Sequence, residues 1–309
     1  MTSASDEGRQ SAHLAGWWRR SAFPLARGWR AAAFSLLLAV LCVFPHTANA
    51  VRAGAPDATD QFSGVGMIVA DPVAGNSPCT GTMLSNTVFL TAAQCVDHLS
   101  ALTFSVGSGM TAHSTEIRMH PFFDTIDGIN LAFDVALVAL DKTEVGTWTG
   151  VTRWALGSMP TGVDATAVGF GETATGVVDN PPTRRSGDLL VTQYVMGADP
   201  DGNILTDAFL ETVPANAQSN MFCLGDAGGP LIFNNAIAGV ASFRFVATCN
   251  EAGSGYYVNP NALSGWIDEN LRAMDPSLVP EPSAVLLLGI GLAGLFGLRR
   301  LARSAGTGA

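Results

Sequence analysis

Short apolar runs separated by turn residues fill most of the middle of the chain. Runs of this length, bounded by glycine, proline, asparagine, aspartate or serine, are typical of β-strands. An earlier set covers Val65 to Val69, Gly81 to Leu84, Val88 to Thr91, Leu102 to Val106 and Val135 to Leu140. A later set includes Asp164 to Phe170, Asp188 to Tyr194, Leu231 to Phe233, Ile237 to Phe243 and Gly255 to Val258. The close spacing of the runs predicts two antiparallel β-barrels.

One segment near the end of this region has a different period. Leu263 to Met274 places Trp266, Ile267 and Leu271 at helical spacing, which predicts a short helix after the last strand. The composition agrees with a β-rich globular core, since 48% of residues are hydrophobic, 14% are charged and 34 are glycine. The expected fold class is all-β with a short C-terminal helix.

Residues 1–50 have the pattern of an export leader. A basic start contains Arg19, Arg20, Arg27 and Arg30. An apolar run from Ala31 to Phe44 follows, and Ala48-Asn49-Ala50 has the small residues of a cleavage site. We expect a signal helix here, removal of residues 1–50 by signal peptidase and a mature chain that begins at Val51.

Three short motifs follow one another along the chain, around residues 94, 134 and 227. They read Thr-Ala-Ala-Gln-Cys over 91–95, Phe-Asp-Val-Ala-Leu over 133–137 and Gly-Asp-Ala-Gly-Gly-Pro over 225–230. They resemble the Thr-Ala-Ala-His-Cys, Asn-Asp-Ile-Ala-Leu and Gly-Asp-Ser-Gly-Gly-Pro motifs of the trypsin/chymotrypsin serine proteases, and their order is that of this family. The resemblance implies a protease-like domain over 51–275 with two six-stranded antiparallel β-barrels.

Two of the three positions that carry catalysis in this family differ here. Asp134 is retained, but Gln94 stands at the general-base position and Ala227 at the nucleophile position. A glutamine amide does not titrate near neutral pH, and an alanine methyl forms no acyl intermediate. We therefore predict a catalytically inactive homologue, a pseudoenzyme, in which the Gln94 amide donates a hydrogen bond to Asp134.

The resemblance also implies the surroundings of the cleft. The backbone amides of Gly225 and Ala227 correspond to the oxyanion donors, and Met221 corresponds to the base of the primary specificity pocket. The other expected pocket residues are Ser242, Arg244 and Gly255. The implied disulfides are Cys79–Cys95 and Cys223–Cys249, which need an oxidising compartment. We expect no metal, because the cysteines lack a CxxC spacing, and we expect no cofactor.

The start of the mature chain has two interpretations. In active members of the family a free apolar N-terminus inserts and pairs with the aspartate before the serine, which here would be Val51 with Asp226. Alternatively, residues 51–60 are a frayed terminus.

The C-terminal segment 279–303 resembles a PEP-CTERM sorting signal. Val279 to Ser283 contains Pro-Glu-Pro, Ala284 to Leu298 is apolar, and Arg299, Arg300 and Arg303 follow. The apolar run predicts a transmembrane helix, and the arginines would hold its end in the cytoplasm. The resemblance implies a Gram-negative bacterium, export across the inner membrane, and an exosortase-type enzyme that removes the tail. A permanent anchor is the alternative.

The charge restricts the class of partner. Residues 51–278 contain 23 Asp and Glu against 8 Lys and Arg, a formal charge of −15, which argues against binding nucleic acid. We expect a protein of the cell surface or extracellular matrix that binds a peptide, a protein or an extracellular polysaccharide. The alternatives are a purely structural matrix protein, or an active serine endopeptidase that has another nucleophile or an altered recorded sequence.

Overall fold

A computed structural model describes residues 54–70, 78–107, 109–123, 131–215, 221–245, 248–249 and 253–278. The expected leader with Val51 and the expected sorting segment 279–303 lie outside the described residues. Among the residues described, no helix is both long enough and apolar enough to cross a bilayer.

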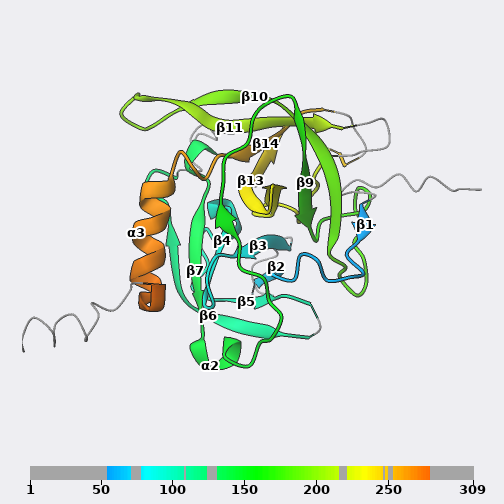
Figure 1. The fold of residues 1–309 in the computed structure, drawn as a ribbon, viewed down its shortest axis with the longest axis vertical. Coiled ribbons are helices and arrows are strands. Elements are labelled where there is room, and N and C mark those ends of the chain that lie inside the picture. The colour runs from blue at the N-terminus through cyan, green and yellow to red at the C-terminus, as the bar shows by residue number, and fades with distance from the viewer. Residues whose placement is uncertain are drawn as a thin grey trace, which may run out of the picture. The chain divides into compact units, whose positions relative to one another are not determined.

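The first half of the described chain forms a closed antiparallel barrel (Figure 1). Its strands pair in the order β2-β3-β4-β7-β6-β5, and pairing of β2 with β5 closes the ring. The strands are β2 (Val65–Ala70), β3 (Cys79–Met83), β4 (Val88–Thr91), β5 (Leu102–Ser105), β6 (Thr111–Met119) and β7 (Ala136–Leu140). The predicted first barrel is therefore confirmed.

Aromatic packing determines which small residues this barrel needs. The rings of Phe89 and Phe104 stack at 4.1 Å inside it, and both side chains are fully buried. A Cβ atom added at Gly81 would lie 2.6 Å from the Phe89 ring, and one at Gly66 would lie 2.5 Å from the Phe104 ring. The two glycines thus make room for the stacked rings between neighbouring strands.

The second half forms another ring of six antiparallel strands. The pairing order is β10-β11-β14-β13-β12-β9, and β9 also pairs with β10. The strands are β9 (Val163–Gly169), β10 (Arg185–Ala198), β11 (Ile204–Pro214), β12 (Pro230–Phe233), β13 (Ala236–Arg244) and β14 (Gly255–Val258). Two short strands pair with strands of this ring: β1 (Ala55–Pro56) pairs with β10, and β8 (Ala155–Leu156) pairs in parallel with β13. The two six-stranded barrels match the expected fold class.

Helices are few and short in the described part of the chain. The helix α3 (Ser264–Met274) falls within the predicted segment, and its Trp266 ring lies 4.9 Å from the ring of His120. The helix α2 (Lys142–Val145) is a single turn, capped by the side chain of Asp141. Three 3₁₀ turns are η2 (Ala93–Cys95), η3 (Leu131–Phe133) and η4 (Pro276–Leu278). Gln94 is the middle residue of η2, and Asp134 directly follows η3.

A buried ion pair joins the segment before β2 to the start of β10. Arg184 Nε donates to Asp57 Oδ2 at 2.8 Å, and the two side chains are 7% and 2% exposed. Arg184 also bonds the backbone oxygen of Val65 at 3.0 Å and pairs with Asp60. Asp57 in turn accepts from the amides of Gln61 and Phe62. The segment 57–65 is therefore fixed to the second barrel through one guanidinium.

Candidate functional site

Gln94 occupies the general-base position beside Asp134. The strand β4 leads directly into η2, and the disulfide between Cys79 and Cys95 holds this turn against β3. The Gln94 side-chain amide, Nε2, donates to Asp134 Oδ2 at 2.6 Å and to the backbone oxygen of Ser242 at 2.8 Å. The amide thus bridges a carboxylate on the first barrel and a strand of the second.

Asp134 is fully buried at the end of η3, yet its carboxylate is well supplied with donors. Besides the Gln94 side chain, the Gln94 backbone amide donates to Oδ1 at 2.8 Å and Ser242 Oγ donates to Oδ2 at 2.6 Å. Burial raises the pKa of Asp134, while the hydrogen bonds from Ser242 and Gln94 oppose that rise. The carboxylate is thus satisfied by hydrogen bonds without an imidazole.

Ala227 lies in a turn whose shape depends on glycine. Gly225 and Gly228 have φ angles of +99° and +81°, in the region that favours glycine. A Cβ atom at Gly228 would lie 2.1 Å from Thr91 Oγ1. The backbone amides of Gly225 and Ala227 donate to no group in the described part of the chain. Those two amides are therefore available to an oxygen placed beside the turn.

Thr80 ties this turn to the first barrel, a contact that the sequence motifs did not indicate. Its backbone amide donates to the Ala227 oxygen at 2.8 Å, and its hydroxyl donates to the Gly225 oxygen at 2.8 Å. The same hydroxyl accepts from the Phe170 amide at 3.2 Å. The fully buried hydroxyl of Thr80, next to Cys79, thus holds the turn at 225–227 in place.

Asp226 is buried beneath the same turn. Its carboxylate accepts from the amides of Gly171 and Cys223, each at 2.7 Å. Its atoms fill the space beside Gly169 and Gly171, since a Cβ at either glycine would lie 2.1 to 2.4 Å from the carboxylate. Burial raises the pKa of Asp226 to about 7. Its expected partner, the amino group of Val51, lies outside the described residues.

A cavity of about 470 Å³ opens beside Gln94 and Ala227. Its walls include two of the expected pocket residues, Ser242 and Arg244, together with apolar side chains of Phe222, Leu224 and Phe243.

The other two expected pocket residues, Met221 and Gly255, do not line this cavity. Met221 is 1% exposed, and Gly255 packs against both Met221 and the ring of Phe222. Arg244 bonds the backbone oxygens of Phe222 and Thr248. Met221 is therefore closed off from the cavity, whereas Phe222 forms part of its wall. The motif spacing located the position of Met221 but gave no sign of this packing.

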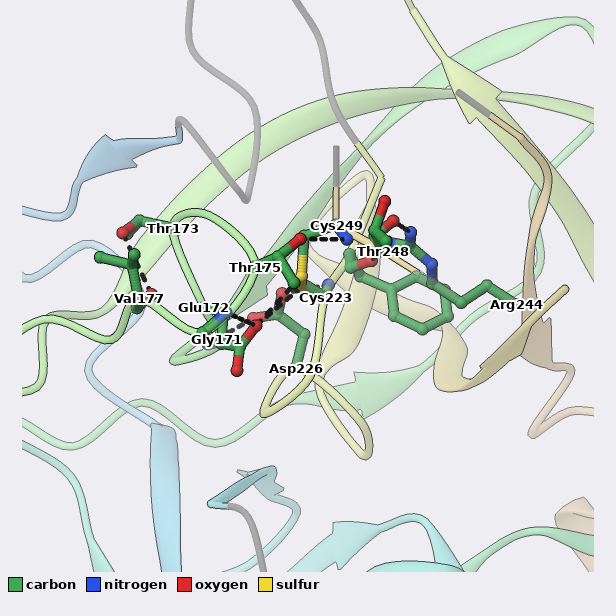
Figure 2. The surroundings of a disulfide bond; sticks show 12 residues. Gly171, Glu172, Thr173, Thr175, Val177, Cys223, Asp226, Arg244, Thr248 and Cys249 are labelled. Atoms are coloured by element: carbon green, nitrogen blue, oxygen red, sulfur yellow. Dashed lines mark hydrogen bonds between the residues drawn. A yellow bond between two sulfur atoms is a disulfide. The ribbon is translucent and has the colours of Figure 1, made fainter. Parts of the chain in front are cut away.

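Both expected disulfides are present, with Cα–Cα distances of 6.0 Å for Cys79–Cys95 and 5.4 Å for Cys223–Cys249. Figure 2 shows Glu172 beside the second disulfide, where Glu172 Oε2 lies 3.3 Å from Cys249 Sγ and 3.8 Å from Cys223 Sγ. These three side chains have the spacing of metal ligands. However, the two sulfurs are bonded to each other, so in the oxidised protein they offer no thiolate ligand to a metal.

Comparison with known protein families decides the assignment. The family model described as Trypsin matches residues 61–267. The chain belongs to the trypsin family. A second model, the PEP-CTERM protein-sorting motif, matches residues 278–301. The match to the trypsin family ends at residue 267, and the match to the sorting motif begins at residue 278.

Individual relatives agree with this assignment. Hypodermin-B of Hypoderma lineatum is 27% identical over 205 residues, which cover 63% of this chain and 78% of that protein. Brachyurin of Leptuca pugilator is 28% identical over 198 residues, covering 57% and 79% respectively. Among solved structures, HL collagenase has a TM-score of 0.57 at 23% identity, over 71% of this chain and 97% of that one. The human heparin binding protein has a TM-score of 0.54 at 19% identity, over 74% and 98%. These two structures show the shared fold.

Proposed function

We propose that this trypsin-family protein is catalytically silent and acts by binding a peptide or protein segment through its former substrate cleft. The observation that carries the proposal is the Gln94–Asp134 contact at 2.6 Å together with the alanine at position 227. Position 94 therefore has no base that could accept a proton, and position 227 has no hydroxyl that could attack a carbonyl. Losing a nucleophile or base of this kind costs roughly a millionfold in turnover in subtilisin, a worked case in mutant kinetics.

The cleft keeps features that suit binding. Its cavity is lined by apolar side chains of Phe222, Leu224 and Phe243, and the amides of Gly225 and Ala227 are available to a carbonyl oxygen. Extended peptides bind to exposed strand edges through backbone hydrogen bonds and place alternate side chains in pockets. Because the cavity has apolar walls and Met221 is closed off from it, we expect a small or flat apolar side chain at the bound position.

The human heparin binding protein, which shares this fold, is named for its binding of heparin. A polyanion of that kind does not suit this chain, because residues 51–278 carry a formal charge of −15. We therefore favour a peptide or protein ligand over an acidic polysaccharide.

The sorting motif implies processing by an exosortase-type system and sorting to a membrane-associated surface. We further propose that signal peptidase removes residues 1–50, that Val51 then pairs with Asp226, and that the exported protein stays at the cell surface or in the extracellular matrix. The transmembrane helix would hold it in the membrane until the tail is cut. Export from the cytoplasm is consistent with the two disulfides, because disulfides form in oxidising compartments.

Peptide selection against the folded, disulfide-intact protein tests the binding proposal. We expect selected peptides to lose at least tenfold in affinity for Ala227→Trp, whose ring would fill the cavity. The matched control is Val178→Trp, because Val178 is 54% exposed and does not line the cavity. Selected peptides that bind Ala227→Trp as well as they bind the native chain, or a selection that yields no binder, would contradict the proposal.

A further inference from the structure

A second cavity, which we call the α2 cavity, has a volume of about 580 Å³ and shares no lining residue with the former substrate cleft. Its walls come from the turn between β3 and β4, from α2 and the segment that follows it, and from residues just after α3. The volume is in the range of small-ligand pockets. It therefore has room for a short peptide segment.

The two basic side chains that line this cavity, Lys142 and Arg153, differ from the other basic side chains of the described residues in their partners. Other basic side chains of the described residues already have oxygen partners: Arg118, Arg184, Arg185 and Arg272 with carboxylates, and Arg244 with backbone carbonyls. Lys142 and Arg153 pair with no carboxylate of the residues that the structure describes, and both line the α2 cavity. Two such cations thus line one cavity, and a carboxylate is the group whose charge complements them.

The remaining charge in the cavity is already engaged. Asp275 is 2% exposed and accepts from the hydroxyls of Ser85 and Ser277 and from the Ser277 amide. Trp148, which also lines the cavity, is half-buried and offers part of its ring. An incoming carboxylate would therefore meet Lys142 and Arg153, while the adjoining apolar group would meet an indole.

A segment with this chemistry begins immediately beside the cavity. Ser277 lines it, and Val279-Pro280-Glu281-Pro282 follows Leu278 in the sequence. Four extended residues span up to about 14 Å, so position 281 is within reach of the cavity. Glu281 is the only acidic residue of 279–309. The proline after it favours an extended backbone, and proline-rich segments of this kind dock against aromatic side chains.

We propose that the α2 cavity binds the chain's own Pro-Glu-Pro motif, with the Glu281 carboxylate between Lys142 and Arg153 and a flanking proline against Trp148. Short tethers give effective concentrations in the millimolar range, so even a weak carboxylate site is filled by its own tail. While the Pro-Glu-Pro motif is docked, the exosortase-type enzyme has no access to it. This consequence rests on the proposed processing of the tail, whereas the docking itself does not.

Zero-length carbodiimide cross-linking of the full chain in detergent tests the docking. We expect an amide bond between Lys142 Nζ and the Glu281 side chain, identified by mass spectrometry of the joined peptides. Arg153→Gln is expected to lower the yield several-fold, because Arg153 holds the carboxylate without being cross-linked itself. A free peptide with the sequence of residues 278–284 is expected to compete, and the same peptide with Gln for Glu281 is not.

Arg272→Gln is the matched control, since Arg272 is exposed and pairs with Asp268 one turn away on α3. It should leave the yield unchanged, and the thermal unfolding of all variants should match that of the native chain. Cross-links from Lys142 to Glu144 alone, or a yield to Glu281 that Arg153→Gln does not change, would overturn the docking. Reaction of the native protein with a serine-directed probe would overturn the proposed function. It would not affect the cross-link between Lys142 and Glu281 or the docking inferred from it.

Discussion

Arg184→Met is expected to lower the free energy of unfolding by about 3–5 kcal/mol. The substitution keeps much of the side-chain volume but removes the guanidinium that pairs with Asp57, whose side chain is only 2% exposed. Removing one partner of a buried ion pair leaves an uncompensated charge, which is the costly case. Urea unfolding of the disulfide-intact protein at constant pH measures the loss.

Two comparisons make this result specific to the ion pair. Arg272→Met removes an exposed arginine that pairs with Asp268 at 3.8 Å, and we expect a change of at most about 0.5 kcal/mol. The double variant Arg184→Met, Asp57→Leu should be less destabilised than the sum of its two single changes, because no charge is then left unpaired. A loss below about 1 kcal/mol for Arg184→Met would show that water reaches Asp57 and that the pair is not a structural link.

The second large effect is a dependence of stability on pH through Asp226. Its folded pKa of about 7 lies above the ordinary value of 3.8, so between these values the folded state holds a proton that the unfolded state has lost. The contribution is fully present below about pH 4 and is lost as pH rises through about 7. At 1.36 kcal/mol for each pKa unit, the total is roughly 4 kcal/mol. The native protein should therefore lose stability relative to Asp226→Asn over this range.

Urea unfolding of both proteins between pH 4 and pH 8 measures that difference. Asp134 also has a raised pKa, but it is present in both proteins and cancels. The same experiment tests whether Val51 pairs with Asp226. In a chain that begins at Val51, insertion of the ammonium group would lower the pKa of Asp226 and remove the trend, whereas one extra residue before Val51 should restore it. A difference that is independent of pH in the extended chain would contradict the burial of Asp226 as a proton-binding group.

The strand pattern predicted the two barrels but missed two of their strands. β6 (Thr111–Met119) was missed because most of its positions are exposed or half-buried and polar. β11 (Ile204–Pro214) was missed although part of it is buried, and its partner β10 runs to Ala198, past the predicted end at Tyr194. Met196 and Ile204, which lie close to the turn that joins β10 to β11, are 65% and 67% exposed. A pattern based on burial does not detect strands that extend beyond the core.

The site was predictable where short motifs define it and unpredictable where distant residues meet. The positions of Gln94, Asp134 and Ala227 followed from local sequence. The link from Thr80 to the turn at 225–227 spans more than a hundred residues and depends on a hydroxyl that belongs to no motif. The burial of Met221 is of the same kind, since it depends on how the Met221 and Phe222 side chains pack against Gly255.

The central claim is that the cleft of this trypsin-family protein holds no reactive serine. Labelling of the folded protein with a fluorophosphonate probe tests it most directly, with Ala227→Ser, Gln94→His as the matched double variant. We expect no label on the native protein and one label at position 227 in the double variant, because the turn and its two free amides are already in place. A stoichiometric label on any serine of the native protein would contradict the account and identify the chain as an enzyme with a relocated nucleophile.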